Sequence, residues 1–251
     1  MDTRGHARTL VEENLNDLQR VNRWLGGAWL TIDALSALLR QEPAAGRGQP
    51  WLVLDVATGG ADIPRAAIAW ARRHGQRLTI VATDISTEFA TVARDRSRAY
   101  PELLVAVADA RRLPFRSGTF DVTTCSLALH HLSWDDAQTM LRELGRCTRR
   151  AVVVNDIVRR WIGYVGAVLA VHLGSRNPLT RHDGPLSVRR AFTRTEMLAL
   201  ARRAGLRPVR WRSFLWYRIA WTAFPVEAGA VERAAPDLQA LAGTAGTSHG
   251  R

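Results

Sequence analysis

Lysine is absent from this 251-residue chain, and all 35 of its basic residues other than histidine are arginine. The absence excludes three mechanisms that need a lysine amine. These are a P-loop nucleotide site, a Schiff-base enzyme and a pyridoxal-phosphate enzyme. Cysteine is nearly absent, and Cys125 and Cys147 lack the spacing of a metal site. We therefore expect no disulfide, no metal and a reducing compartment, the cytoplasm.

Long apolar runs are also missing from the sequence. The first 14 residues contain no apolar signal core, and the longest uncharged run, Trp161 to Gly174, is too short to span a bilayer. We expect no membrane span. The net charge of +12 is spread along the chain in arginine pairs. This pattern favours a solvated surface, and the alternative is a basic face that meets nucleic acid or anionic lipid.

The stretch from Trp51 to Asp62 (WLVLDVATGGAD) combines a buried strand, a turn of small residues and the start of a helix. Its apolar half is typical of a strand in a parallel sheet. Asp62 is placed to cap the helix that follows, with Pro64 in its first turn. Such a turn leaves backbone N–H groups open to a ligand, and Asp55 favours a ligand with positive or hydroxyl groups.

Strand and helix patterns alternate five times after residue 50, which predicts an α/β fold with a doubly wound, mostly parallel sheet. The last two strand-like segments predict an antiparallel hairpin. A capping box at Thr193 and Glu196 begins the helix before it. We expect an N-terminal helical lid (1–45), a main domain (46–226) with an inserted substrate cap (about 159–192), and a disordered tail (227–251).

Polar residues follow each of the first five predicted strands, and ligands in such sheets lie beyond the carboxyl ends of the strands. They are Asp55, Asp84, Asp109, His130, His131 and Asp156. We interpret them as one site, in which Asp84 binds a ribose and Asp109 with Ala110 binds an adenine edge. A nicotinamide dinucleotide fits poorly, because the turn lacks the last glycine of G-x-G-x-x-G and is flanked by carboxylates.

These motifs resemble the class I S-adenosylmethionine-dependent methyltransferases. The small-molecule type, similar to the ubiquinone/menaquinone biosynthesis and polyketide-associated methyltransferases, is the most similar. The resemblance covers roughly Trp51 to Ala223 and implies a Rossmann-like sheet of seven strands. The resemblance also implies which residues of this sequence bind S-adenosylmethionine. They are Asp55, Ala57, Gly59, Asp84, Ile85, Asp109, Ala110 and Ser126. Ala57 and Ala61 stand where the family usually has glycine, and the extra methyl group of Ala61 is tolerable only if φ there is negative.

Methyl transfer to a phenol needs a base, and histidine has a suitable pKa. The resemblance implies His131 as general base oriented by Asp156, with His130 as the substitute. Trp161 and His182, in the expected cap, are candidate substrate residues. The predicted acceptor is a small aromatic or lipid-tailed molecule, methylated on oxygen.

Three alternatives remain open. They are C-methylation of a quinol or polyketide ring, methylation of RNA or DNA, and cofactor binding without transfer. The sequence does not predict the oligomeric state, and we expect no nucleic-acid partner.

Overall fold

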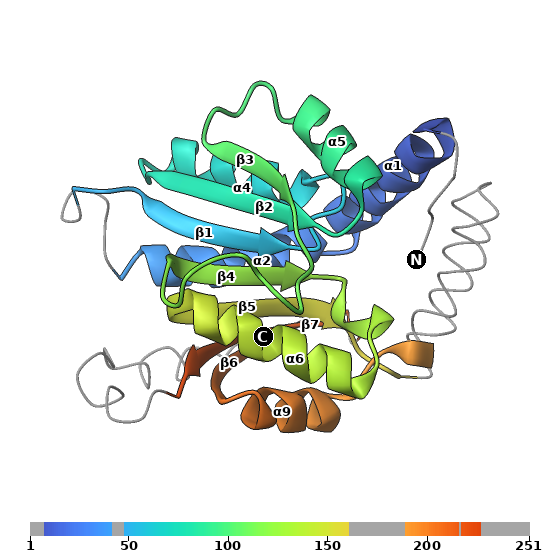
Figure 1. Ribbon diagram of the computed structural model, residues 1–251, viewed down its shortest axis with the longest axis vertical. Coiled ribbons are helices and arrows are strands. Elements are labelled where there is room, and N and C mark those ends of the chain that lie inside the picture. Colours follow the sequence, from blue (N-terminus) through green and yellow to red (C-terminus); the bar gives the residue numbers. More distant parts are fainter. Residues whose placement is uncertain (1–7, 42–47, 161–188, 216, 227–251) are drawn as a thin grey trace, which may run out of the picture.

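A computed structural model describes residues 8–41, 48–160, 189–215 and 217–226. Within these ranges a single seven-stranded sheet has the order β3-β2-β1-β4-β5-β7-β6 (Figure 1). The strands are β1 (Trp51–Val56), β2 (Leu78–Asp84), β3 (Leu103–Val107), β4 (Phe120–Ser126), β5 (Thr148–Ile157), β6 (Leu206–Phe214) and β7 (Arg218–Pro225). The first five strands pair in parallel, and β7 runs antiparallel to both β5 and β6. The predicted fold class and the final hairpin are confirmed.

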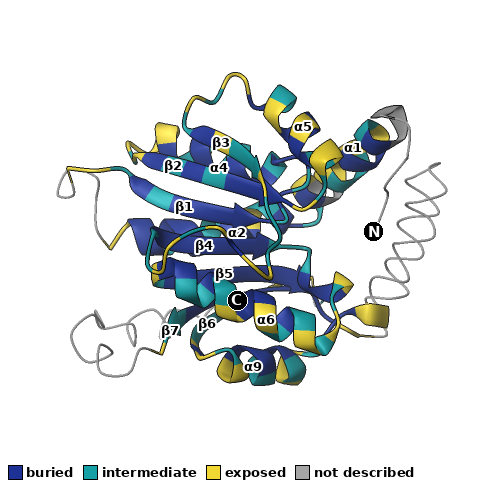
Figure 2. Cartoon of the chain, viewed as in Figure 1, coloured by how far each residue is buried: buried dark blue, intermediate teal, exposed yellow. Residues whose placement is uncertain are grey.

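Helices cover both faces of the sheet, so most strand residues are buried (Figure 2). The helices are α1 (Arg8–Trp24), α2 (Gly27–Leu39), α4 (Asp62–Arg73), α5 (Thr87–Arg96), α6 (Trp134–Cys147) and α9 (Arg194–Arg203), with the short 3₁₀ helix η1 (Leu129–His131) after β4. One apolar core lies under α6 and α9, and a second lies under α2, α4 and α5. None of the helices in the described ranges is long and apolar enough to cross a membrane.

Alternation along the strands decides which side chains reach each face. In β5, Val152 and Val154 belong to the core under α6, whereas Ala151 and Val153 belong to the core under α2. Because neighbouring strand residues point to opposite faces, the two polar residues that follow diverge. Asn155 points toward α2, where its amide donates to the backbone of Gly27, and Asp156 reaches η1.

The predicted capping box is confirmed. The Thr193 hydroxyl and the Glu196 carboxylate form a complete capping box at the start of α9. Gly26 separates α1 from α2, with φ of 77°, and a Cβ there would overlap the ring of Phe214. The remaining segments of the expected plan, namely the central part of the cap and the C-terminal tail, lie outside the described residues.

Candidate functional site

The turn after β1 has a tightly folded backbone. Ala57, Gly59 and Ala61 all have positive φ, at 52°, 55° and 54°. The condition of negative φ at Ala61 is not met, because this residue takes the N-cap position of α4 in the left-handed conformation. Asp62 is therefore the first residue of the helix rather than its cap, and its carboxylate accepts a hydrogen bond from Asn22 of α1. Left-handed alanines are strained, and such strain is concentrated at ligand sites.

Asp84, the last residue of β2, holds this turn in place. Its Oδ2 accepts from the Gly59 N–H at 2.8 Å, and its Oδ1 accepts from the Ser86 N–H at 3.0 Å. Burial raises the pKa of Asp84, and these backbone hydrogen bonds oppose the rise. Each carboxylate oxygen keeps a second lone pair, so the residue can still accept from two ribose hydroxyls. Ile85, which follows, is 61% exposed and offers an apolar surface beside it.

Asp55 lies inside the sheet next to the turn. The Thr124 hydroxyl on β4 donates to its Oδ1 at 2.6 Å. Burial raises the pKa of Asp55 to about 7, and the hydrogen bond from Thr124 opposes only part of that rise. A buried carboxyl group with this pKa readily loses its proton and becomes negatively charged when a cation approaches.

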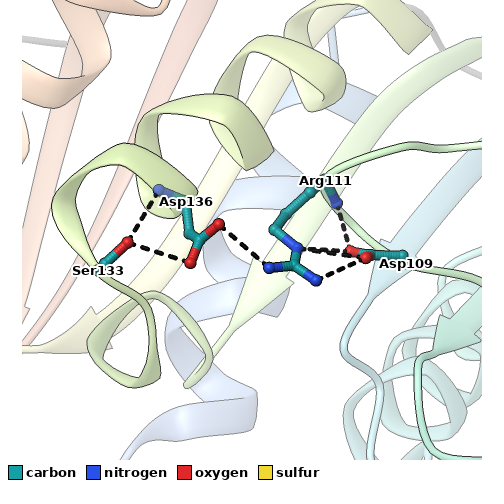
Figure 3. Close-up of polar contacts among 4 residues, drawn as sticks. All are labelled: Asp109, Arg111, Ser133 and Asp136. Carbon is teal, nitrogen blue, oxygen red and sulfur yellow. Dashed lines mark hydrogen bonds and ion pairs between the residues drawn. The ribbon is translucent and has the colours of Figure 1, made fainter.

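Asp109, expected at an adenine edge, forms an ion pair in this structure (Figure 3). Arg111 donates to both of its carboxylate oxygens and also to Asp136 of α6, which Ser133 contacts in turn. Arg111 holds the pKa of Asp109 below its usual range. The bridge ties the segment after β3 to the start of α6. The neighbouring backbone at Ala110 lies in the same segment.

The histidine pair after β4 is held by Asp156, but the pairing differs from the expected one. Nδ1 of the buried His130 lies 2.6 Å from Oδ1 of Asp156, and the backbone N–H groups of Leu129 and His130 donate to Oδ2. The expected contact between His131 and Asp156 is therefore wrong. The short turn of η1 directs the first histidine, rather than the second, toward β5.

The charge state of Asp156 decides how His130 is oriented. Burial acts to raise the pKa of Asp156, but His130 and the surrounding hydrogen bonds outweigh it, and the pKa lies below its usual value. An ionised carboxylate only accepts, so Nδ1 of His130 is the donor, and in the neutral imidazole Nε2 would carry the free lone pair. Such a pair is chemically able to accept a proton at Nε2.

His131 stacks beside His130, with ring centroids 4.1 Å apart. His131 is exposed at the surface, but partial desolvation of its ring and then the neighbouring His130 together lower its pKa to about 3. A base with that pKa binds a proton too weakly to work well near neutral pH. His131 therefore stays neutral in this environment.

Sequence reasoning missed a polar network between the strand ends and α2. The hydroxyls of Ser126 and Thr31 lie 3.0 Å apart, and Asn155 donates to both Thr31 and the backbone oxygen of Gly27. No sequence signal pairs α2 with β4 and β5, because these segments are far apart in the chain. Trp161 and His182, the candidate substrate residues, lie outside the described residues.

The residues present fit S-adenosylmethionine. Asp84 has free lone pairs that suit the ribose hydroxyls, and the exposed apolar side chain of Ile85 suits the base. The strained turn at Gly59 suits a ligand that approaches the backbone closely. Helix α1 packs over this turn, because a Cβ on Gly59 or Gly60 would lie 3.5 or 3.6 Å from Leu15. We therefore expect the cofactor between α1 and the strand ends.

Comparison with known proteins gives the same answer. The family model described as "Methyltransferase domain" matches residues 53–151. This match, over 99 of the 251 residues, supports a class I S-adenosylmethionine-dependent methyltransferase. Its cofactor is S-adenosylmethionine. This confirms the resemblance drawn from the motifs.

One curated relative is the "Ubiquinone/menaquinone biosynthesis C-methyltransferase UbiE" of Neisseria gonorrhoeae. It is 36% identical over 95 residues, which make up 38% of this chain and 37% of that relative. The matched part thus spans little more than a third of the relative's length.

Two solved structures share the fold of this methyltransferase. A SAM-dependent methyltransferase from Aquifex aeolicus has a TM-score of 0.58 at 16% identity, covering 87% of this chain and 98% of that one. Magnesium protoporphyrin IX methyltransferase from Synechocystis PCC 6803, with bound SAH, has a TM-score of 0.54 at 17% identity. That alignment covers 78% of this chain and 82% of the other.

The raised pKa of Asp55 predicts a pH-dependent cofactor affinity. The methionine portion of the cofactor carries an ammonium group, which favours the ionised form of a nearby carboxyl group. Asp55 has to lose its proton for this, so affinity falls as pH drops through about 7, by up to about tenfold per unit. Calorimetric titration with S-adenosylhomocysteine between pH 5.5 and 8 measures the effect.

Asp55→Asn is the matched variant, and its affinity should be nearly independent of pH. Without ligand the same group acts on stability in the opposite direction. Its pKa is higher in the folded than in the unfolded protein, so its stabilising contribution is lost as pH rises through about 7. A wild-type affinity that does not change with pH would contradict the assignment of Asp55 to the ammonium.

Proposed function

We propose that this methyltransferase transfers a methyl group to a ring carbon of a phenolic or quinol small molecule, with His130 as general base. The observation that carries the proposal is the buried hydrogen bond between Nδ1 of His130 and Asp156. The name of the relative from N. gonorrhoeae, a ubiquinone/menaquinone biosynthesis C-methyltransferase, supports carbon as the methylated atom and a quinol as the class of acceptor. The proposed location is the cytoplasm.

The dyad suits removal of a proton from a hydroxyl group. Nε2 of His130 accepts the proton, and Asp156 stabilises the imidazolium that forms, because it stays ionised beside it. The phenolate left behind carries negative charge on its oxygen and on the ortho and para carbons. A single base therefore activates the ring carbon without contacting it. After methyl transfer the methylated ring carbon loses its proton and the oxygen regains one, which restores the aromatic phenol.

When bound, S-adenosylmethionine supplies a methyl group already activated on a sulfonium. We propose that Asp84 and Ile85 hold the nucleoside part and that the turn at Gly59 and the buried Asp55 hold the methionine part. Ala57 lies in the same turn, and Ser126 is the last residue of β4, the strand that pairs with β1. The protein then has to place the acceptor against the methyl group and exclude water.

O-methylation of the same phenolic class is the second candidate. The observation that favours it is again the dyad, because a base that removes the hydroxyl proton makes that oxygen a nucleophile. The two reactions share the cofactor site and the base, and they differ only in which atom of the acceptor lies nearest the methyl group.

The test uses S-adenosylmethionine with a ¹³C-labelled methyl group and matched pairs of alkylresorcinol-type phenols. In each pair one member has free ring positions beside the hydroxyl, and the other has these positions blocked by substituents. We expect label at the chemical shift of an aryl methyl carbon with the first member and no product with the second. Label at the shift of a methoxy carbon, from both members, would establish O-methylation instead. Label found only in added RNA or DNA would overturn both candidates.

A further inference from the structure

Arg218 is a buried cation near the carboxyl ends of the parallel strands, where the cofactor is expected. It is the first residue of β7 and is 1% exposed. Because β7 runs antiparallel to β5, its first residue lies opposite Ile157, at the carboxyl end of β5. Ile219 packs into the core under α6, so Arg218 points to the opposite face, toward α2.

The guanidinium of Arg218 has few partners in the described part of the chain. Nη1 donates to the side-chain oxygen of Asn22 at 3.3 Å, and Nε has no hydrogen-bond partner. Burial lowers the pKa of Arg218, while Tyr217, Asp156 and Asp62 oppose this change. Asn22 links it indirectly to Asp62, whose carboxylate accepts from the Asn22 amide at 3.1 Å. A desolvated cation without an anion in contact is costly, and a ligand that supplies the anion removes that cost.

The N-terminus of α2 lies directly against this guanidinium. A Cβ on Gly27 would lie 1.9 Å from Nη1 of Arg218, so only glycine permits the approach. The N-cap of this 13-residue helix is Gly26, which has no side chain to cap it, and the first turn contains no acidic residue. The uncapped N–H groups and the helix dipole favour an anion at this end.

We propose that Arg218 and the N-terminus of α2 form a carboxylate-binding site beside the methionine end of the cofactor. The planar guanidinium matches a carboxylate, and the nearby Asp62 and Asp156 favour a single negative charge over the two of a phosphate. The position of the ligands in this proposal rests on the proposed function. The carboxylate belongs either to the methionine part of the cofactor or to the acceptor.

Binding measurements on the purified chain distinguish the two sources. The first arm compares S-adenosylhomocysteine with its decarboxylated analogue by calorimetry. The second compares phenols with and without a ring carboxylate in the presence of S-adenosylhomocysteine. Wild-type protein should prefer the carboxylate in one of these pairs by about 10- to 100-fold, the loss expected for one charged hydrogen-bonded contact. Arg218→Met should bind both members of that pair equally, and Arg218→Lys should keep part of the preference.

A second readout separates binding from a structural role. Removing an unpaired buried charge should leave the melting temperature of ligand-free Arg218→Met equal to or above that of wild type, while the shift on adding ligand shrinks. Arg210→Met is the control, because Arg210 lies on the adjacent strand and already has Asp33 as its ion-pair partner. It should leave the preference for the carboxylate intact.

The proposal is overturned if wild type shows no preference in either pair. It is also overturned if Arg218→Met keeps the wild-type preference. If Arg218→Met fails to fold, the proposal is still tested by the preference of wild type in the two ligand pairs and by that of Arg218→Lys. An undiminished preference in Arg218→Lys contradicts the role of the guanidinium. These assays measure binding without turnover, so they stand even if no methylated product is found.

Discussion

His130→Gln should lower kcat by about 10²- to 10⁴-fold, the usual contribution of a general base. Glutamine can still donate a hydrogen bond to Asp156, but it cannot accept the proton of the acceptor hydroxyl. The Kd for S-adenosylhomocysteine should stay within a few-fold of wild type, because the dyad acts on the acceptor. Transfer of labelled methyl groups, measured at saturating concentrations of both substrates, gives kcat.

His131→Gln distinguishes the two histidines. The side chain of His131 has no hydrogen bond to Asp156, and its pKa of about 3 makes it a poor base at neutral pH. We expect its kcat to fall far less than that of His130→Gln. Equal losses in both variants, or a larger loss in His131→Gln, would sink the assignment of His130. Thermal unfolding of each variant shows whether a loss reflects misfolding instead.

Asp84→Ala should weaken cofactor binding by about 100-fold or more. The substitution removes the acceptors of the Gly59 and Ser86 N–H groups as well as those proposed for the ribose. Hydrogen bonds to a charged group contribute about 1.5–3 kcal/mol each, so the loss of two is enough for this effect. Calorimetry with S-adenosylhomocysteine measures it directly.

Asp109→Ala is the comparison for this variant. Asp109 is partly exposed and bound by Arg111, so its removal should cost much less cofactor affinity than the removal of Asp84. Asp84→Asn should fall between wild type and Asp84→Ala, because the amide keeps a single acceptor. Unchanged affinity in Asp84→Ala would exclude this residue from the cofactor site.

The order of elements followed from local patterns. Short β-branched runs separated by helical periodicity placed all five parallel strands, and the capping box at Thr193 placed the start of α9. Each of these signals lies within a few residues of the feature it predicts. For the same reason the acids at strand ends could be assigned to one edge, since parallel strands bring their carboxyl ends together.

Details of backbone geometry were beyond such patterns. The left-handed Ala61 belongs to a turn whose Gly59 N–H is held by Asp84, 23 positions after Ala61. The choice between His130 and His131 depended on a single turn of 3₁₀ helix, which a run of two histidines does not reveal.

By itself the sequence determined the fold class and the set of strand-end residues, because periodicity and motif spacing are local properties, and the family resemblance of those motifs implied the cofactor. Only the tertiary structure decided which histidine Asp156 contacts and that Arg218 lies under Gly27. These pairings join segments separated by 26 and 191 positions. They arise from sheet order and from the opposite faces of neighbouring strand residues, which no local pattern specifies.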